Sequence, residues 1–400
     1  MEEEKNYHKK GIAAGAALAG APAAANAVRT AAGIILTPKP AKEKEANLLK
    51  AEGGIIRDSE GNPVVFTGTN LGEAGFDCLE YGKPCEGNEK DNFAALAERF
   101  GNYGAREVFG SAYESLISAS DIKSLAKAGA NCVLIPLRSF LLTGNVKDKK
   151  HDLSLAHIDK ILDACKKAGI YAILSLKEAP GPQNNMITRG KDGADSLFGS
   201  KKSASLQSET VKLWAKIAKR YKDREEIAAY NLLESPQADS AGDVYKLYSR
   251  IIAAVRKEKD NHIIITELPG GETAGFEKLE DDNLAIGFSG SCATVYELET
   301  FINNAVKAKE TGAPVVALSF YPADYESAVS KLKAQGIGVT AGSYKGDEFC
   351  MMSGNRAVID IKNDSFDDIK GKFADALKTK NFKKNKELTK AVFGEKKKNK

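Results

Sequence analysis

Residues 227–236 read Ile-Ala-Ala-Tyr-Asn-Leu-Leu-Glu-Ser-Pro, an apolar run that stops at charged and polar residues. A short run of this kind, without strict alternation, is typical of a parallel strand that is covered on both faces. Similar runs recur near residues 64–71, 131–137, 171–177, 262–268, 284–289, 315–320 and 337–342. The recurrence predicts a sheet of eight parallel strands, and the first of them follows a hairpin over residues 54–65.

Helical periods separate most of these runs. Residues 153–168 place their apolar side chains on one stripe, and 210–220 do the same with Trp214, which we expect in the core. The pattern repeats at 244–255, 295–309 and 325–334. Eight strands alternating with helices over about 300 residues predict an α/β fold, a (β/α)8 TIM barrel, in preference to an open sheet. An open doubly wound sheet usually carries a glycine-rich phosphate loop after its first strand, and none is present here.

Composition divides the chain into three parts. Residues 51–377 carry the strand and helix pattern, and we expect them to form a single barrel domain. Residues 1–50 form an Ala/Gly-rich leader with a charged linker, in which Lys9 and Lys10 before an apolar stretch resemble a signal peptide or signal anchor. Residues 378–400 contain ten Lys and two Glu, which is typical of a solvated basic tail.

The ends of the chain also bear on location and partners. The leader favours an exported or membrane-associated protein, with a cytoplasmic one as the alternative. The net charge of +4 is unevenly spread, because the Lys-rich end carries +8 and the remainder about −4. Leader and tail therefore favour contact with a membrane or another anionic surface. We expect no nucleic-acid partner, since no basic patch interleaved with aromatic residues occurs in the barrel.

Cysteine and histidine usage predicts neither a metal site nor a cofactor. The six cysteines form no C-x-x-C pair, and the four histidines are scattered. Cys132 lies in a strand and Cys165 in a helix, where buried free thiols are expected. Cys78 and Cys85 fall in one loop, and they would be able to form a disulfide if the chain is exported.

Several segments resemble landmarks of glycoside hydrolase family 5. Leu-Leu-Glu-Ser-Pro at 232–236 resembles the family signature Leu-Leu-Asn-Glu-Pro. The resemblance extends over about residues 53–390 and is carried further by segments 68–72, 131–136, 176–184, 213–223, 312–320 and 343–345. It is closest to the exo-β-1,3-glucanase and endoglucanase branches. It implies a retaining glycosidase, in which two Glu carboxyls about 5–5.5 Å apart serve as acid and nucleophile.

The same resemblance implies that both carboxylates have been lost. It places the acid at Ser235 and the nucleophile at Ser319, and a serine hydroxyl is no general acid near neutral pH. The supporting positions differ as well: Leu134 replaces an Arg, Lys177 a His, Ser289 and Ser291 a His-x-Tyr pair, and Gly342 a Trp. We therefore predict a non-catalytic barrel that serves in binding or as a scaffold.

Two alternatives remain open at this stage. A divergent β-glucan-hydrolysing glycosidase would use relocated carboxylates such as Glu234, paired with another acid near the strand ends. A lectin-like module would hold a glycan in the old cleft through Tyr81, Tyr321 or Tyr344. The partner is thus a glycan such as a β-glucan, or another protein.

Some residues near the strand ends carry more specific expectations. Candidates for ligand binding are Asn70, Glu178, Glu267 and Tyr344. We expect Glu234 to form an ion pair with Lys177 on the neighbouring strand, and Arg138 to be a solvated charge at the rim.

Overall fold

The computed structural model describes residues 28–29, 35–36, 46–72, 89–142, 153–184, 195–269, 276, 279–346, 350–354 and 359–394. Two compact units are distinguished, residues 1–45 and residues 46–400. In the first unit, β1 (Val28–Arg29) pairs antiparallel with β2 (Ile35–Leu36). Lys9 and Lys10, with most of the leader expected over residues 1–50, lie outside the described residues, as do Cys78 and Cys85. Within the described part of the chain, no helix is both long and apolar enough to cross a membrane.

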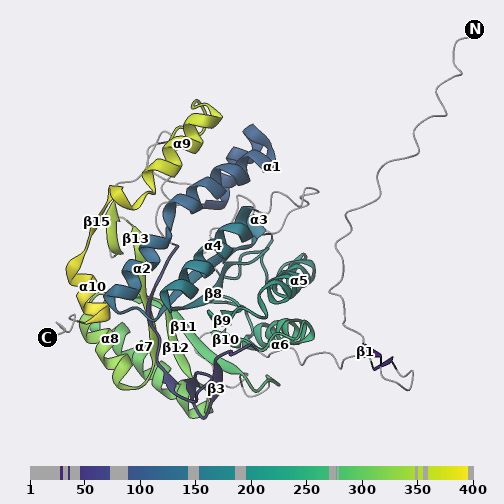
Figure 1. Ribbon diagram of the computed structural model, residues 1–400, viewed down its shortest axis with the longest axis vertical. Helices are drawn as coiled ribbons and strands as arrows, with labels where there is room; N and C mark the ends of the chain where they lie inside the picture. Colours follow the sequence, from purple (N-terminus) through teal and green to yellow (C-terminus); the bar gives the residue numbers. More distant parts are fainter. Residues whose placement is uncertain are drawn as a thin grey trace, which may run out of the picture. The chain divides into compact units, whose positions relative to one another are not determined.

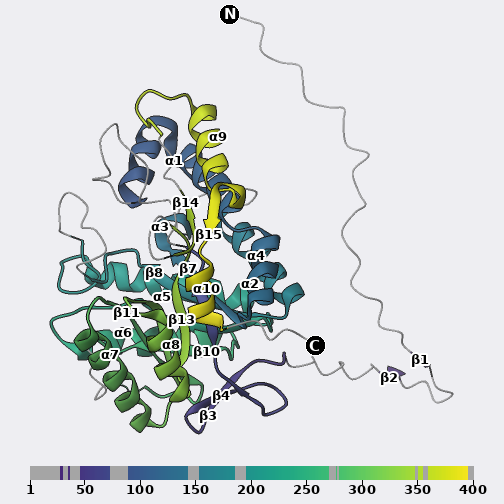
Figure 2. The same cartoon turned by 90° about the vertical axis from the view of Figure 1, so that its left-hand side faces the viewer.

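The second unit is a closed parallel barrel, as the sequence predicts (Figures 1 and 2). In the described part of the chain, eight strands form the barrel: β6 (Thr67–Asn70), β7 (Cys132–Arg138), β8 (Tyr171–Glu178), β9 (Ile227–Asn231), β10 (Ile263–Glu267), β11 (Leu284–Cys292), β12 (Val315–Pro322) and β13 (Gly338–Gly346). Each strand pairs in parallel with the next. The barrel closes because β13 pairs with β12 on one side and with β6 on the other.

Helices surround the barrel on its outer side (Figure 1). Those in the described connections are α1 (Glu89–Leu116), α2 (Ala119–Ala128), α3 (Ser139–Leu142), α4 (Leu153–Ala168), α5 (Ser203–Tyr221), α6 (Ala241–Lys257), α7 (Val295–Ala308) and α8 (Tyr325–Ala334). Their starts follow local sequence chemistry. Ser118 and Thr294 each form a capping box, with Asp121 and Glu297 respectively.

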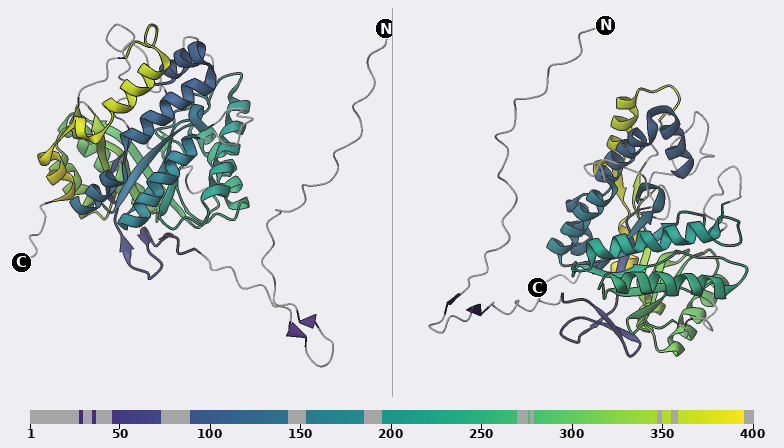
Figure 3. Two further views of the ribbon diagram at one scale, coloured as in Figure 1. Left: turned by 45° about the horizontal axis from the view of Figure 1, so that its top comes forward. Right: turned by 90° about the vertical axis from the view of Figure 1, so that its right-hand side faces the viewer.

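Additional elements lie at both ends of the barrel. At one end β3 (Lys50–Glu52), β4 (Ile55–Arg57) and β5 (Pro63–Val64) form a small antiparallel sheet. The opposite end carries α1 and α9 (Phe366–Ala376), which pack side by side (Figure 3). Next to β13 the sheet continues through β14 (Cys350–Gly354) and β15 (Phe382–Lys384).

Two apolar cores fill the barrel and the layer around it. Inside the barrel, Leu134, Ile173 and Leu318 belong to a cluster of inward-facing strand residues. Between strands and helices lies a larger cluster that includes Trp214, which is fully buried as expected and donates from its indole nitrogen to Leu232 O at 3.1 Å. Adjacent strands approach closely at Gly68, where a Cβ would lie 2.1 Å from the Cys132 carbonyl oxygen. Only glycine fits there.

The predicted elements agree well with those observed. The strands occur at the expected runs, and α4 and α8 have the predicted bounds. Cys132 and Cys165 are buried free thiols, as expected. Helices α1, α2 and α9, which form much of the outer layer on one side, were not predicted from the sequence.

The expectation of a solvated tail over residues 378–400 is wrong for its described part. Residues 379–394 contain the 3-10 turn Thr379–Asn381, strand β15, which pairs antiparallel with β14, and helix α10 (Lys386–Phe393). Leu388 and Val392 of α10 are buried, and the helix contacts α8, β14 and β6. The lysines lie between these apolar positions, so the segment is an amphipathic cover for the barrel.

A buried lysine ties this segment to the barrel. Lys345 on β13 is fully buried, and its Nζ donates to Leu116 O, to Leu377 O at 3.3 Å and to Thr379 Oγ1 at 2.9 Å. Its ion pair with Asp121 has an N–O distance of 3.7 Å. Burial lowers the pKa of Lys345 to about 8 in spite of Asp121.

We predict that Val392→Ala lowers the free energy of unfolding by about 1–3 kcal/mol, because it empties a site that is only 1% exposed. The matched change Lys386→Ala, on the exposed side of α10, should alter stability by less than about 0.5 kcal/mol. Urea unfolding measures both. Equal stabilities of the two variants would contradict a docked α10.

Candidate functional site

The carboxyl ends of the barrel strands bring the expected site residues together. Glu234 and Ser235 follow β9, Glu267 ends β10, and Ser319 lies on β12. In this fold the mouth at the carboxyl ends is where function resides. Glu267 and Ser319 are buried there, whereas Glu234 and Ser235 are partly exposed.

The backbone is strained at both positions where the resemblance implies a catalytic carboxylate. Ser235 has a φ of 47° and Ser319 a φ of 40°, which place them in the left-handed region. Residues other than glycine are uncommon there, and such conformations cost about 1–3 kcal/mol each. Gly342, at the position implied for a Trp, also has a positive φ of 56°. The described mouth thus has an unusual backbone at three of the positions that the resemblance implies for the site.

A hydrogen-bonded network occupies the centre of the mouth. Ser319 Oγ donates to Glu234 Oε2 at 3.1 Å, and Ser175 Oγ donates to the same oxygen at 3.4 Å. Asn70 Nδ2 donates to Ser319 Oγ at 3.0 Å, and Asn70 Oδ1 accepts from the Gly72 N–H. The carboxylate of Glu234 is thereby linked to strands β6, β8 and β12.

Glu267 forms the second half of this network. Its Oε1 accepts from Asn231 Nδ2 at 2.7 Å and from Ser289 Oγ at 2.8 Å, and its Oε2 accepts from the Ser235 N–H at 2.9 Å. Burial, and next the negative charge of Glu234, raise the pKa of Glu267 to about 8, although these three donors act in the opposite direction. Glu267 is therefore largely protonated at neutral pH.

The other supporting positions that the resemblance implies lie in different environments. Leu134 is fully buried in the barrel core, Ser289 contacts Glu267, and Ser291 is exposed near the end of β11. Lys177 and Glu178 end β8, and Glu178 lies in register with Arg138 of β7. The ion pair between Glu234 and Lys177 stays a prediction.

Two expectations from the sequence are wrong. Tyr344 is buried instead of lining the mouth, and its hydroxyl donates to Asp121 Oδ1 at 2.8 Å. Arg138 is 6% exposed instead of solvated, and its Nη2 donates to Gly72 O at 3.0 Å. Both are covered by an outer layer that includes α1 and α2, which the sequence did not predict. Tyr81 lies outside the described residues.

Two members of the network were missed. Ser175 is bonded by Asn231 Nδ2 at 2.9 Å, so that these two side chains join the Glu234 and Glu267 halves. Each is a polar residue in an apolar strand. Ser175 lies two positions after the inward-facing Ile173, and Asn231 two positions after the inward-facing Ala229, so both point to the same side of the strand as these residues. The alternation of side chains along a strand was the signal that would have found them.

The chemistry open to this arrangement is acid–base chemistry by a carboxyl pair. Nucleophilic serine chemistry would need a histidine base. Of the described histidines, His262 precedes β10 at the opposite end of that strand from Glu267, about 16 Å away at 3.3 Å per residue. His157 lies on α4, outside the barrel. Within the described residues, no group of His, Cys, Asp and Glu is arranged to hold a metal ion.

Comparison with known proteins agrees with the resemblance seen in the sequence. Residues 100–286 match the family model described as cellulase (glycosyl hydrolase family 5). A beta-xylosidase of Phanerodontia chrysosporium is 30% identical over 224 residues, 55% of this chain and 46% of that protein. A probable glucan 1,3-beta-glucosidase A of Aspergillus fumigatus is 24% identical over 193 residues, 46% of this chain and 45% of that protein. The chain thus spans under half the length of these curated relatives.

Solved structures share the fold. An endogalactoceramidase superposes with a TM-score of 0.55 at 16% identity, covering 82% of this chain and 84% of its own. The mannohexaose complex of a Thermomonospora fusca beta-mannanase gives 0.52 at 11% identity, covering 88% and 95%. At these identities the likeness concerns the barrel alone.

The raised pKa of Glu267 predicts a pH-dependent stability. Between its ordinary pKa of 4.5 and about 8, the folded protein holds a proton that the unfolded chain has released. Stability therefore falls as pH rises through this window, by up to about 1.4 kcal/mol per pH unit. Glu267→Gln should remove this slope, whereas the exposed Glu310→Gln should keep it. Urea unfolding at several values between pH 5 and 8 measures it, and parallel curves for wild type and Glu267→Gln would contradict the assignment.

Proposed function

We propose that this chain, whose barrel belongs to glycosyl hydrolase family 5, binds a β-linked glycan at its mouth without hydrolysing it. The matched relatives are a beta-xylosidase, glucan glucosidases and endoglucanases by name, and one structural neighbour holds mannohexaose. These names support a glycan as the ligand class. The mouth of this chain supports the absence of hydrolysis.

One observation carries the proposal: the hydroxyl of Ser319 donates to the carboxylate of Glu234. Ser319, at the position implied for the nucleophile, has a hydroxyl in place of a carboxylate. This hydroxyl donates to Glu234, which precedes Ser235, the position implied for the acid. Loss of a positioned acid alone removes about 10²–10⁴ in rate. Loss of the nucleophile removes the covalent route as well.

Exposed groups at the same end support glycan binding. Ser291 is exposed on β11, and Tyr296 follows on the first turn of α7 with 81% exposure. An exposed tyrosine ring offers an apolar face beside a polar hydroxyl, which suits a sugar ring with its own apolar face and hydroxyl edge. Partly exposed Glu234 and Ser289 supply acceptors and donors nearby.

A second candidate is a glycosidase with relocated carboxyls, and the state of Glu267 favours it. A carboxyl that stays protonated at neutral pH beside an ionised one is the arrangement that acid catalysis requires. Glu267 would be the acid and Glu234 the nucleophile or base. Against this, the three donors to Glu267 and its 3% exposure leave little of it accessible to a substrate.

We predict no turnover of activated aryl β-glucosides, β-xylosides or β-mannosides by the wild-type chain above the uncatalysed rate. The measurement is release of the aryl alcohol from pH 4 to 9. Turnover that is lost in both Glu234→Gln and Glu267→Gln, but kept in Ser235→Ala and Ser319→Ala, would replace the first proposal by the second.

Glycan binding gives a separate prediction. Tyr296→Ala should weaken the affinity for the bound oligosaccharide about tenfold, since an aromatic contact contributes about 1 kcal/mol or more. Tyr103→Ala, which removes another exposed tyrosine on α1, should leave it unchanged. Calorimetry with β-1,3-, β-1,4-gluco-, xylo- and manno-oligosaccharides measures both. No binding to any of the four series would refute glycan recognition.

A further inference from the structure

The turn after β9 carries a carboxylate of the mouth next to a strained residue. Glu234 is partly exposed, and Ser235, which follows it, has a φ of 47° in the left-handed region. Such a conformation persists only where neighbouring groups hold it, because it is unfavourable for a residue with a Cβ. One contact comes from β10, since the Ser235 N–H donates to Glu267 Oε2 at 2.9 Å. The carbonyl groups of the turn need donors from another element.

Gln183 supplies one of these donors from the loop after β8. Its side chain is fully buried. Its Nε2 donates to Glu234 O at 3.1 Å and to Lys177 O at 2.8 Å, so one amide group joins the end of β8 to the turn after β9. Its Oε1 accepts from the Ala179 N–H at 3.0 Å. Both ends of the side-chain amide are bonded to the main chain, and this fixes the orientation of the amide.

The same loop holds the turn at two further points. Asn184 Nδ2 donates to Ser235 O at 2.9 Å, and the Gln237 N–H donates to the backbone carbonyl of Gln183 at 2.8 Å. Residues 176–184 carry part of the family resemblance, and these contacts give the end of that segment a task in the mouth.

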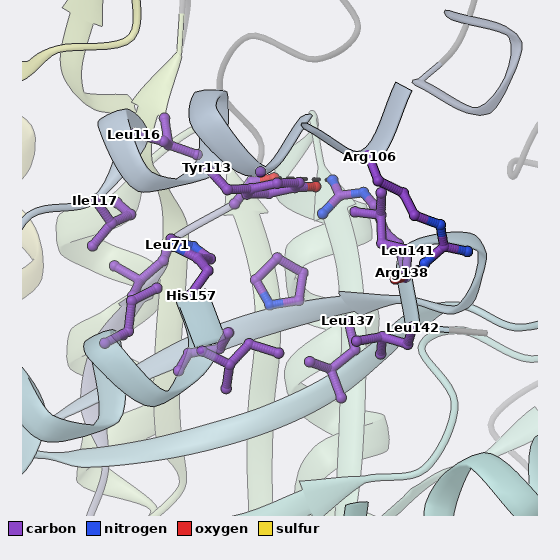
Figure 4. A pocket seen from close by; sticks show the side chains of 16 residues that line it. Leu71, Arg106, Tyr113, Leu116, Ile117, Leu137, Arg138, Leu141, Leu142 and His157 are labelled. Atoms are coloured by element: carbon purple, nitrogen blue, oxygen red, sulfur yellow. Dashed lines mark hydrogen bonds between the residues drawn. The ribbon is translucent and has the colours of Figure 1, made fainter. Parts of the chain in front are cut away.

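The donors to the Glu234 carboxylate are fixed from the other side of the mouth. Figure 4 shows Arg138 of β7 in the wall of a pocket that α1, α3 and α4 also line. Its Nη2 donates to Gly72 O at 3.0 Å, and the Gly72 N–H donates to Asn70 Oδ1 at 3.0 Å. Asn70 therefore directs its Nδ2 to Ser319, whose hydroxyl donates to Glu234. The side chains around the carboxylate are held by β6 and β7, and the main chain that bears it is held by the loop after β8.

We infer that Gln183 and Asn184 are positioning residues of the mouth, which hold Glu234 and Ser235 in the conformation that a glycan meets. The inference rests on the proposed function for its ligand, whereas the hold on the turn rests on contacts within the chain. Glutamine suits the buried place because its amide donates to two carbonyls and accepts from an N–H without carrying a charge. A charged side chain there would have to be paired to offset the cost of its burial.

The test compares two variants with a matched control. Gln183→Met keeps the length of the side chain and removes its amide, and Asn184→Ala removes the donor to Ser235 O. The control is Gln207→Met, because Gln207 of α5 also donates to a backbone carbonyl, Leu197 O at 3.1 Å, but not to the turn. Far-ultraviolet circular dichroism and urea unfolding confirm folding. Asn184 is only partly buried, so its variant decides the test if Gln183→Met does not fold.

Hydrogen–deuterium exchange of the Ser235 N–H, resolved by NMR, reports on the turn itself. We expect this N–H to exchange at least about tenfold faster in both variants, beyond any change at the Ala172 N–H, which donates to Glu226 O at the other end of the barrel. A purely structural role would lower global stability and raise both rates together. An unchanged Ser235 rate in a folded variant, equal changes at Ser235 and Ala172, or the same effect in Gln207→Met would overturn the inference.

Calorimetry of oligosaccharide binding in the same proteins reports on the ligand. Both variants should bind about tenfold more weakly than the wild type, because a displaced carboxylate loses a charge-assisted hydrogen bond to the sugar. Gln207→Met should bind as the wild type does. Unchanged affinity in a folded variant with faster Ser235 exchange would overturn the positioning role. Absence of binding by the wild type would refute the proposed function instead, and the exchange rates would then decide whether Gln183 and Asn184 hold the turn.

Discussion

Closure of the sheet by the pairing of β13 with both β12 and β6 is the constraint on which the rest depends. Once the barrel is closed, every inward-facing side chain must pack or form hydrogen bonds within a fixed space. Leu134 and Leu318 meet this demand by apolar contact in the middle of the barrel. Near the carboxyl ends the same space is filled by serine, asparagine and glutamate, which form hydrogen bonds with one another across the barrel.

The same demand accounts for the arrangement of Glu234 and Glu267 in the mouth. Where the resemblance implies a pair of catalytic glutamates, two serines leave room, and Glu234 and Glu267 lie among the resulting hydroxyl and amide groups. Burial, and next the negative charge of Glu234, raise the pKa of Glu267 to about 8 and so oppose its ionisation. The mouth is thus polar and internally bonded, and sugar recognition would be confined to its rim.

Much of the fold could be predicted from the sequence, because strand runs and helical stripes are local signals. The helices α4 and α8 were located to the residue, and the strand runs to within a few residues. The outer layer could not be predicted in this way. α1 contains a non-helical Gly101, and the lysines of α10 obscure its two buried residues. For the same reason Tyr344 and Arg138 were placed at the rim, since a strand pattern does not reveal that further elements cover its outer face. The site positions were implied by resemblance, whereas the pKa of Glu267 depends on burial that only the folded barrel defines.

The left-handed backbone at Ser235 and Ser319 has a consequence for how such a mouth can accept substitutions. The left-handed conformation is unfavourable for a serine, so the surrounding strands must stabilise it. The main chain of the mouth is therefore held by the strands around it and not by the side chains at these two positions. A scaffold of this kind can exchange one chemistry for another by substitution alone, without rebuilding its main chain, and this makes the barrel a durable template for new functions.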